Sequence, residues 1–101
     1  MTLNLTQQQA EALFEVFQNF ILPAKPVRAK DKLIIMMLLK VFRKLRAKLE
    51  ARLPRGYSIT LAPEEAMAYF AYFDGYTFPP TMIYEKNFIS AQINEINRQL
   101  F

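Results

Sequence analysis

Seven consecutive apolar residues, Leu33–Leu39, stand near the start of a long predicted helix and restrict how this chain can fold. The helix is predicted to run from an Asp31 N-cap to Leu53, just before a proline. A helix with apolar side chains on every side has to be covered on every side. The sequence therefore predicts a central helix that is either wrapped by the rest of the chain or covered by a second copy of the protein.

Part of this apolar segment points away from the main apolar face of the predicted helix. Met36 and Leu39 are the clearest cases, since successive residues turn by about 100° around a helix. Each such side chain contributes roughly 1.5–3 kcal/mol when it is buried, and a group of them left exposed favours aggregation. We therefore expect a homodimer contact here if one chain does not cover these residues itself. The predicted self-association residues are Leu33, Met36, Met37 and Leu39.

The first part of the chain predicts a strand and a helix. Apolar and polar residues alternate over Thr2–Thr6, as they do in a half-buried strand. Thr6 and Gln9 then form the Thr-x-x-Gln pattern of a capping box, in which each side chain bonds the other residue's backbone N–H. A helix with an apolar stripe is predicted from Gln7 to about Leu22, where prolines end it.

The second part of the chain predicts the same order of elements. After a turn at Arg55–Gly56, residues Tyr57–Leu61 alternate again and predict a second strand. Pro63 at a first helical position predicts a helix that ends near Asp74. Asn87 is a suitable cap for a last helix, which would continue to residue 101.

The two halves align without a gap. Residues 1–45 match residues 57–101 at a constant offset of 56, and seven of the 45 pairs are identical, among them Leu5/Leu61 and Phe14/Phe70. Ordinary residue frequencies would supply about three identities. The alternative is that any two strand–helix units share such a pattern. The sequence predicts one domain, 1–101, with an α+β, helix-dominated fold. It consists of two β-α-α units (1–45 and 57–101) joined through residues 46–56, related by a pseudo-twofold axis, with a small two-stranded ribbon.

The charge is distributed unevenly along the chain. The segment Lys25–Arg55 holds eleven basic and two acidic residues, an excess of +9, whereas the remainder holds two basic and seven acidic residues, or −5. This basic surface is either a solvated helix face or a site for an anionic partner, which would be nucleic-acid phosphate, a membrane surface or an acidic protein. The predicted anion-binding residues are Arg28, Lys30, Lys32, Lys40, Arg43, Lys44, Arg46, Lys48 and Arg55.

The residue types needed for most catalytic chemistry are missing. The chain has no histidine and no cysteine. Cys–His and Ser–His–Asp catalytic constellations are therefore excluded, and soft metal sites lack their ligands. No glycine-rich phosphate loop occurs, and Glu64 and Glu65 stand where acids complement a helix dipole. We expect no enzyme, no cofactor, no metal site and no small-molecule substrate.

Two further expectations concern the cellular context. The longest apolar run is much shorter than the ~20 residues that span a bilayer, and the first residues lack a signal-peptide pattern. With no cysteine, these features predict a cytoplasmic protein.

The functional hypothesis is a non-enzymatic interaction module that self-associates through the apolar part of the middle helix. The alternative is a nucleic-acid-binding accessory protein that uses the basic helical face without sequence preference.

Overall fold

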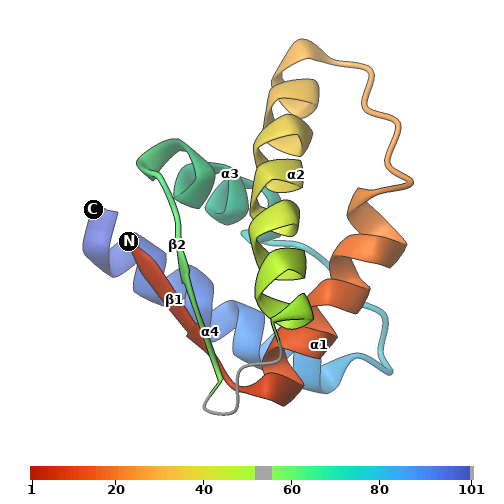
Figure 1. Ribbon diagram of the computed structural model, residues 1–101. Coiled ribbons are helices and arrows are strands. Elements are labelled where there is room, and N and C mark those ends of the chain that lie inside the picture. The colour runs from red at the N-terminus through yellow and green to blue at the C-terminus, as the bar shows by residue number, and fades with distance from the viewer. Residues whose placement is uncertain (52–55, 101) are drawn as a thin grey trace.

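A computed structural model describes residues 1–51 and 56–100 and confirms a helix-dominated α+β fold (Figure 1). The predicted end of the middle helix at Leu53, the turn residue Arg55 and the C-terminal Phe101 lie outside the described residues. In chain order the elements are β1 (Thr2–Leu5), α1 (Gln7–Val16), the π-helix η1 (Phe17–Ile21), α2 (Ala29–Glu50), β2 (Tyr57–Thr60), α3 (Pro63–Phe73) and α4 (Ile83–Leu100).

The two strands pair with each other as an antiparallel ribbon, as the sequence predicts. Leu3 lies opposite Ile59, and Leu5 lies opposite Tyr57. These four side chains are buried, whereas the alternate residues of both strands are exposed. The period-two pattern of the sequence therefore places one face of the ribbon on the helices and leaves the other face in solvent.

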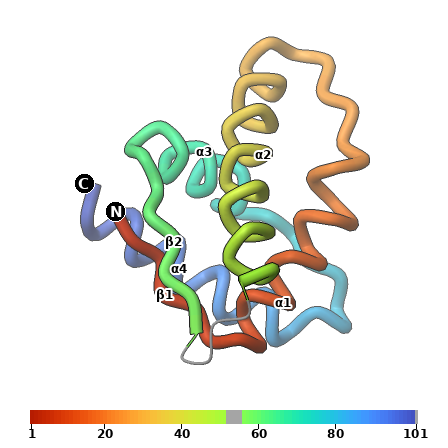
Figure 2. Tube along the Cα trace, viewed as in Figure 1, coloured from red at the N-terminus to blue at the C-terminus, as the bar shows by residue number. Residues whose placement is uncertain are grey.

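The helices form the rest of the core around α2. Helix α2 packs against α1 and α3, and α4 packs against the same two helices. Figure 2 shows the long connection that leads from the end of η1 to the start of α2. The largest fully buried side chains come from every helix and include Leu13, Phe17, Leu38, Leu45, Tyr69, Ile89 and Ile96.

The local signals at the start of the first helix are confirmed. The Thr6 hydroxyl accepts a hydrogen bond from the Gln9 N–H, and the Gln9 side chain accepts one from the Thr6 N–H, each at 3.1 Å. The helix predicted to end near Leu22 does form, but its last part, η1, is wound as a π-helix in which the Leu22 N–H donates to the Phe17 carbonyl. Thr6 and Gln9 bond each other within one turn of the chain, which is why the sequence pattern locates this capping box.

Two predicted helix caps are wrong. Helix α2 begins at Ala29 with Arg28 as its N-cap, so Asp31 lies inside the first turn. Helix α4 begins at Ile83, so Asn87 lies inside the helix rather than at its start. An N-cap side chain contributes only about 1 kcal/mol, and in both cases the preceding residues extend the helix without a break. Asp31 still complements the helix dipole from its place in the first turn.

The internal duplication stays a prediction. The elements do follow one another as β-α-α twice, and the ribbon places Leu3 opposite Ile59, which the 56-residue offset equates. A twofold axis that relates the two strands would therefore pass between these residues. The helices differ more, because η1 interrupts the first unit and α2 has 22 residues where α4 has 18.

The approach of Gly56 to β1 gives a prediction about stability. Gly56 has φ +89°, and a Cβ there would lie 2.7 Å from the Leu5 carbonyl oxygen, whereas Gly75 has φ +73° and open space around it. Gly75→Ala should lower the free energy of unfolding by about 1 kcal/mol, through backbone strain alone. Gly56→Ala should lower it by about 2–3 kcal/mol, because a steric clash is added to similar strain. Urea unfolding of the two variants measures the difference, and equal losses would contradict the close approach.

Candidate functional site

Helix α2 has one buried face and one exposed stripe. Leu38, Val41 and Leu45 are completely buried against the core. On the opposite side an exposed stripe follows the three- and four-residue helical spacing, first apolar and then basic. Its residues are Leu33, Met36, Lys40 and Arg43. Leu33 and Met36 are 57% and 61% exposed, so this chain does not cover every side of its central helix.

A largely apolar hollow of about 400 Å³ lies beside this stripe, between α2 and α3; we call it the α2/α3 hollow. Helix α2 lines it with Lys30, Leu33, Ile34 and Met37, and helix α3 lines it with Glu64, Met67, Ala68 and Ala71.

The two charged residues of the hollow stand at opposite ends. Lys44 of α2 contacts Glu65, near the start of α3. Asp31 and Ile34, ten and more residues earlier in α2, share a separate hollow with Tyr72, near the end of α3. Helices α2 and α3 therefore run antiparallel, so the start of α3 lies beside a later part of α2 and the end of α3 lies beside the start of α2. Glu64 thus marks one end of the α2/α3 hollow, and Lys30 marks the other.

An ion pair fixes α2 at the Glu64 end. The Lys44 Nζ lies 2.6 Å from the Glu65 Oε1 and also donates a hydrogen bond to the Thr60 carbonyl at 3.0 Å. The same Glu65 oxygen accepts a 2.8 Å hydrogen bond from the Ala62 N–H, in place of a side-chain N-cap for α3. Glu65 is only 4% exposed. Its buried carboxylate is therefore paired with a cation and hydrogen-bonded, as burial of a charge requires.

The surroundings of Glu65 change its acidity. Burial by itself raises the pKa of the Glu65 carboxyl, but the hydrogen bonds from Lys44 and from the Ala62 N–H, with the positive charges of Lys44 and Lys40, outweigh burial. The pKa is therefore lowered from its ordinary value of 4.5. Glu65 is ionised at neutral pH, and its charge stabilises the fold there.

Two of the predicted basic residues have acidic partners within the described part of the chain. Lys44 pairs with Glu65, and Arg46 pairs with Glu50 on the same helix, while Arg55 lies outside the described residues. Three basic residues stand at the start of α2 and three along its second half; all six are exposed and make no ion pair within residues 1–51 and 56–100. They are Arg28, Lys30 and Lys32 in the first group and Lys40, Arg43 and Lys48 in the second.

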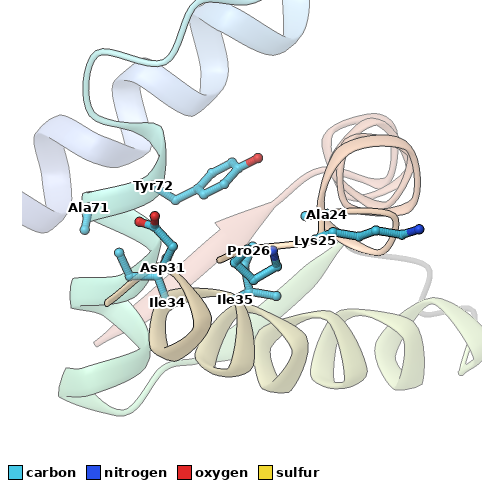
Figure 3. Close-up of a pocket in the computed structure, with 8 residues that line it drawn as sticks. All are labelled: Ala24, Lys25, Pro26, Asp31, Ile34, Ile35, Ala71 and Tyr72. Carbon is cyan, nitrogen blue, oxygen red and sulfur yellow. The ribbon is translucent and has the colours of Figure 1, made fainter. Parts of the chain in front are cut away.

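The second hollow beside α2, also about 400 Å³, is shown in Figure 3. The Asp31 carboxylate and the Tyr72 ring lie on one side of it, and the Lys25 ammonium points away. Burial, and secondarily the neighbouring Tyr76 hydroxyl, raises the pKa of Tyr72 to about 12. The Tyr72 phenol therefore keeps its proton at neutral pH.

No group of three or more acidic side chains that could hold a metal ion occurs in the described part of the chain. None of the described helices is both long enough and apolar enough to cross a membrane. No protein family, curated protein or solved structure significantly matches the chain.

Sequence reasoning found only the α2 side of the α2/α3 hollow. Of the four predicted self-association residues, Leu33 and Met37 line it; Met36 is exposed on the adjoining stripe, and Leu39 is partly buried against the core. The α3 side was missed, although its residues have a helical spacing that sequence does reveal. They are Glu64, Met67, Ala68 and Ala71. What sequence does not reveal is that this stripe faces α2.

The lowered pKa of Glu65 predicts how its contribution depends on pH. Glu65→Gln should lower the free energy of unfolding at pH 7 by about 1–2 kcal/mol, because a charged hydrogen bond is lost and Lys44 is half in solvent. A lowered pKa in the folded state stabilises the fold above pH 4.5, and this stabilisation is lost as the pH falls through the folded-state value. The difference between the two proteins should therefore shrink below about pH 4.5 in urea titrations. Glu15→Gln, at an exposed position of α1, is the control and should change little. A difference that is independent of pH would contradict the assignment.

Proposed function

We propose that this protein is a non-enzymatic interaction module that forms a homodimer through the α2/α3 hollow. The observation that carries the proposal is the composition of the hollow, which has apolar walls with one cation at one end and one anion at the other. A contact between two copies buries the walls and pairs the charges at the same time.

The apolar residues supply the attraction. Leu33 and Met36 are more than half exposed, and Met67 is 39% exposed, so all three lose contact with water when a second copy covers them. Ala68 and Ala71 are small and let a second helix approach closely. Methionines adapt to a partner surface through their flexible side chains. The hollow and the exposed Met36 beside it would form the centre of an interface; a standard interface buries about 800 Å² on each partner.

The charges favour a second copy over an unrelated partner. In a twofold-symmetric interface the same patch meets itself, and each end of the patch lies against the opposite end of the other copy. An axis through the middle of the α2/α3 hollow therefore brings Lys30 of one copy to Glu64 of the other, twice. A surface with one sign of charge would repel itself in this arrangement, whereas this surface attracts itself.

Charge exchange tests the arrangement. Lys30→Glu alone and Glu64→Lys alone should each weaken the dimer about tenfold or more, because each places like charges together at both ends. An equimolar mixture of the two variants should form a heterodimer, since every contact across its axis again joins opposite charges. The double variant Lys30→Glu/Glu64→Lys should recover the homodimer. Sedimentation equilibrium and native mass spectrometry at tens of micromolar measure these species.

Matched controls separate the interface from net charge. Lys86→Glu and Glu15→Lys make the same charge changes at exposed positions of α4 and α1 and should leave the dimer intact. A parent protein that is monomeric at these concentrations would refute the proposal. A dimer that ignores both exchanges would show that the contact lies elsewhere.

A second candidate function is sequence-independent binding of nucleic acid. It is favoured by Lys40, Arg43 and Lys48, which are exposed within about two turns of α2 and make no ion pair in the described part of the chain. If these residues contact phosphates, the logarithm of the affinity should fall linearly with the logarithm of the salt concentration. The slope should be about −0.7 to −0.9 per contact.

The double variant Lys40→Glu/Arg43→Glu should reduce that slope by roughly two contacts and barely change the melting temperature, because exposed charges contribute little to stability. Fluorescence anisotropy with mixed-sequence DNA and RNA at several salt concentrations gives the slope, and Lys86→Glu is again the control. Undetectable binding at about 50 mM salt would exclude this candidate.

A further inference from the structure

Strand β2 has one paired edge and one open edge. The Leu61 N–H donates to the Met1 carbonyl at 2.7 Å, and the Met1 amino group donates back to the Leu61 carbonyl. Backbone groups of an antiparallel strand face its partner at every second residue. Ile59 and Tyr57 therefore face β1 as Leu61 does, and the backbone groups of Ser58 and Thr60 point away from β1.

The outward backbone groups are mostly unused. The Thr60 carbonyl accepts from the Lys44 Nζ, which places this edge toward α2. Within residues 1–51 and 56–100, no hydrogen bond is made by the Ser58 N–H, the Ser58 carbonyl or the Thr60 N–H. Such an edge is a template for another extended chain.

A groove follows this open edge. It has a volume of about 580 Å³ and lies between β2 and the second half of α2, which run side by side in Figures 1 and 2. Ser58, Ile59 and Thr60 form the strand side, and Lys44, Ala47 and Lys48 form the helix side. The small Ala47 leaves room between two cations that are spaced by one helical turn.

We propose that this groove binds an extended acidic peptide, which adds to β2 as a third strand. The peptide backbone exchanges hydrogen bonds with the N–H and carbonyl of Ser58 and accepts one from the Thr60 N–H. Its carboxylates on the helix side lie against Lys48 and the exposed part of Lys44. Strand addition of this kind takes affinity from the main chain and specificity from side-chain contacts.

The chemistry of the groove distinguishes a peptide from other occupants. The edge offers both donors and an acceptor, and a peptide backbone satisfies both, whereas a phosphodiester backbone supplies acceptors only. A second copy that paired β2 with β2 would bring Lys44 and Lys48 of both chains to one seam, where like charges repel. The inference is independent of the homodimer, because no residue of the groove lines the α2/α3 hollow.

The chain offers an internal comparison. The outer edge of β1 also borders a hollow, of about 410 Å³, between β1 and α4. The polar residues that line that hollow are four amides, one threonine and one acid, without a basic side chain: Asn4, Gln9, Gln92, Gln99, Thr2 and Glu95. An acidic peptide therefore finds two lysines among the residues that line the β2 groove, whereas the hollow beside β1 is lined by Glu95, which already holds the nearby Arg98 in an ion pair.

The test uses a seven-residue peptide of alternating glutamate and valine, acetylated and amidated at its ends, with the full chain labelled for NMR. The peptide should shift the Ser58 and Thr60 amide signals, slow their hydrogen exchange, and leave the Thr2 and Asn4 amides unchanged. Lys48→Glu should weaken binding about tenfold at 50 mM salt. Arg43→Glu makes the same charge change on the same helix outside the groove and should weaken it less than twofold.

Two further measurements test the strand pairing itself. A peptide methylated on alternate backbone nitrogens keeps its charge but loses its donors, and it should not bind. Ser58→Pro removes the outward N–H and keeps the backbone ladder to β1, losing only the exposed hydrogen bond that the Ser58 hydroxyl donates to the Asn4 side chain. The variant should therefore fold, by circular dichroism, and lose peptide binding. Binding that survives both changes is purely electrostatic and would overturn the inference. So would no shift at millimolar peptide, or an oligonucleotide of equal charge that shifts the Ser58 and Thr60 amides equally.

Discussion

The contact between Lys44 and Glu65 joins three elements at one point. Lys44 belongs to α2, its second acceptor Thr60 ends β2, and Glu65 bonds the backbone where α3 begins. The pair therefore fixes the spacing of α2 from the ribbon on one side and from α3 on the other. Most of the folding free energy comes from the apolar core, since an ion pair with one partner half in solvent contributes little by itself. The pair instead sets how the surfaces of α2 are oriented relative to the ribbon and to α3.

Helix α2 is long enough to divide its exposed surface between two kinds of chemistry. Its first half borders the α2/α3 hollow with Leu33 and Met37, and its second half borders the strand groove with Lys44 and Lys48. The core uses only one stripe of a helix, and in a small protein no further layer of chain covers the remaining stripes. Exposed apolar residues favour association with another surface, whereas exposed basic residues stay hydrated until an anion binds them. One helix can in this way serve both a second copy and a separate acidic partner.

The features that sequence predicted correctly are those decided within a few residues. The alternation around Leu3 and Ile59 fixes the buried face of each strand, and the Thr6–Gln9 capping box fixes a helix start, because both patterns act locally. Asp31 and Asn87 failed as caps because a single favourable side chain is outweighed when the helix can extend backward by a turn. The partner of Lys44, twenty-one residues away, and the facing of Met67 toward α2 depend on how helices pack, for which the sequence carries no local signal.

The predicted duplication gives a physical meaning to the uneven charge of the chain. With the offset of 56, the strand residues Thr2–Asn4 correspond to 58–60, and each of these segments does border a hollow beside a helix, β1 next to α4 and β2 next to α2. Two units of common origin would begin with two similar grooves. The offset places the apolar Leu100 opposite Lys44, and Lys48 lies in the connection outside the two units, so neither cation has a basic counterpart in the other groove. A solvated helix face would not need its basic residues on one copy of a repeated groove. Charge confined to the open edge of β2 is what selective binding at one of two related edges requires.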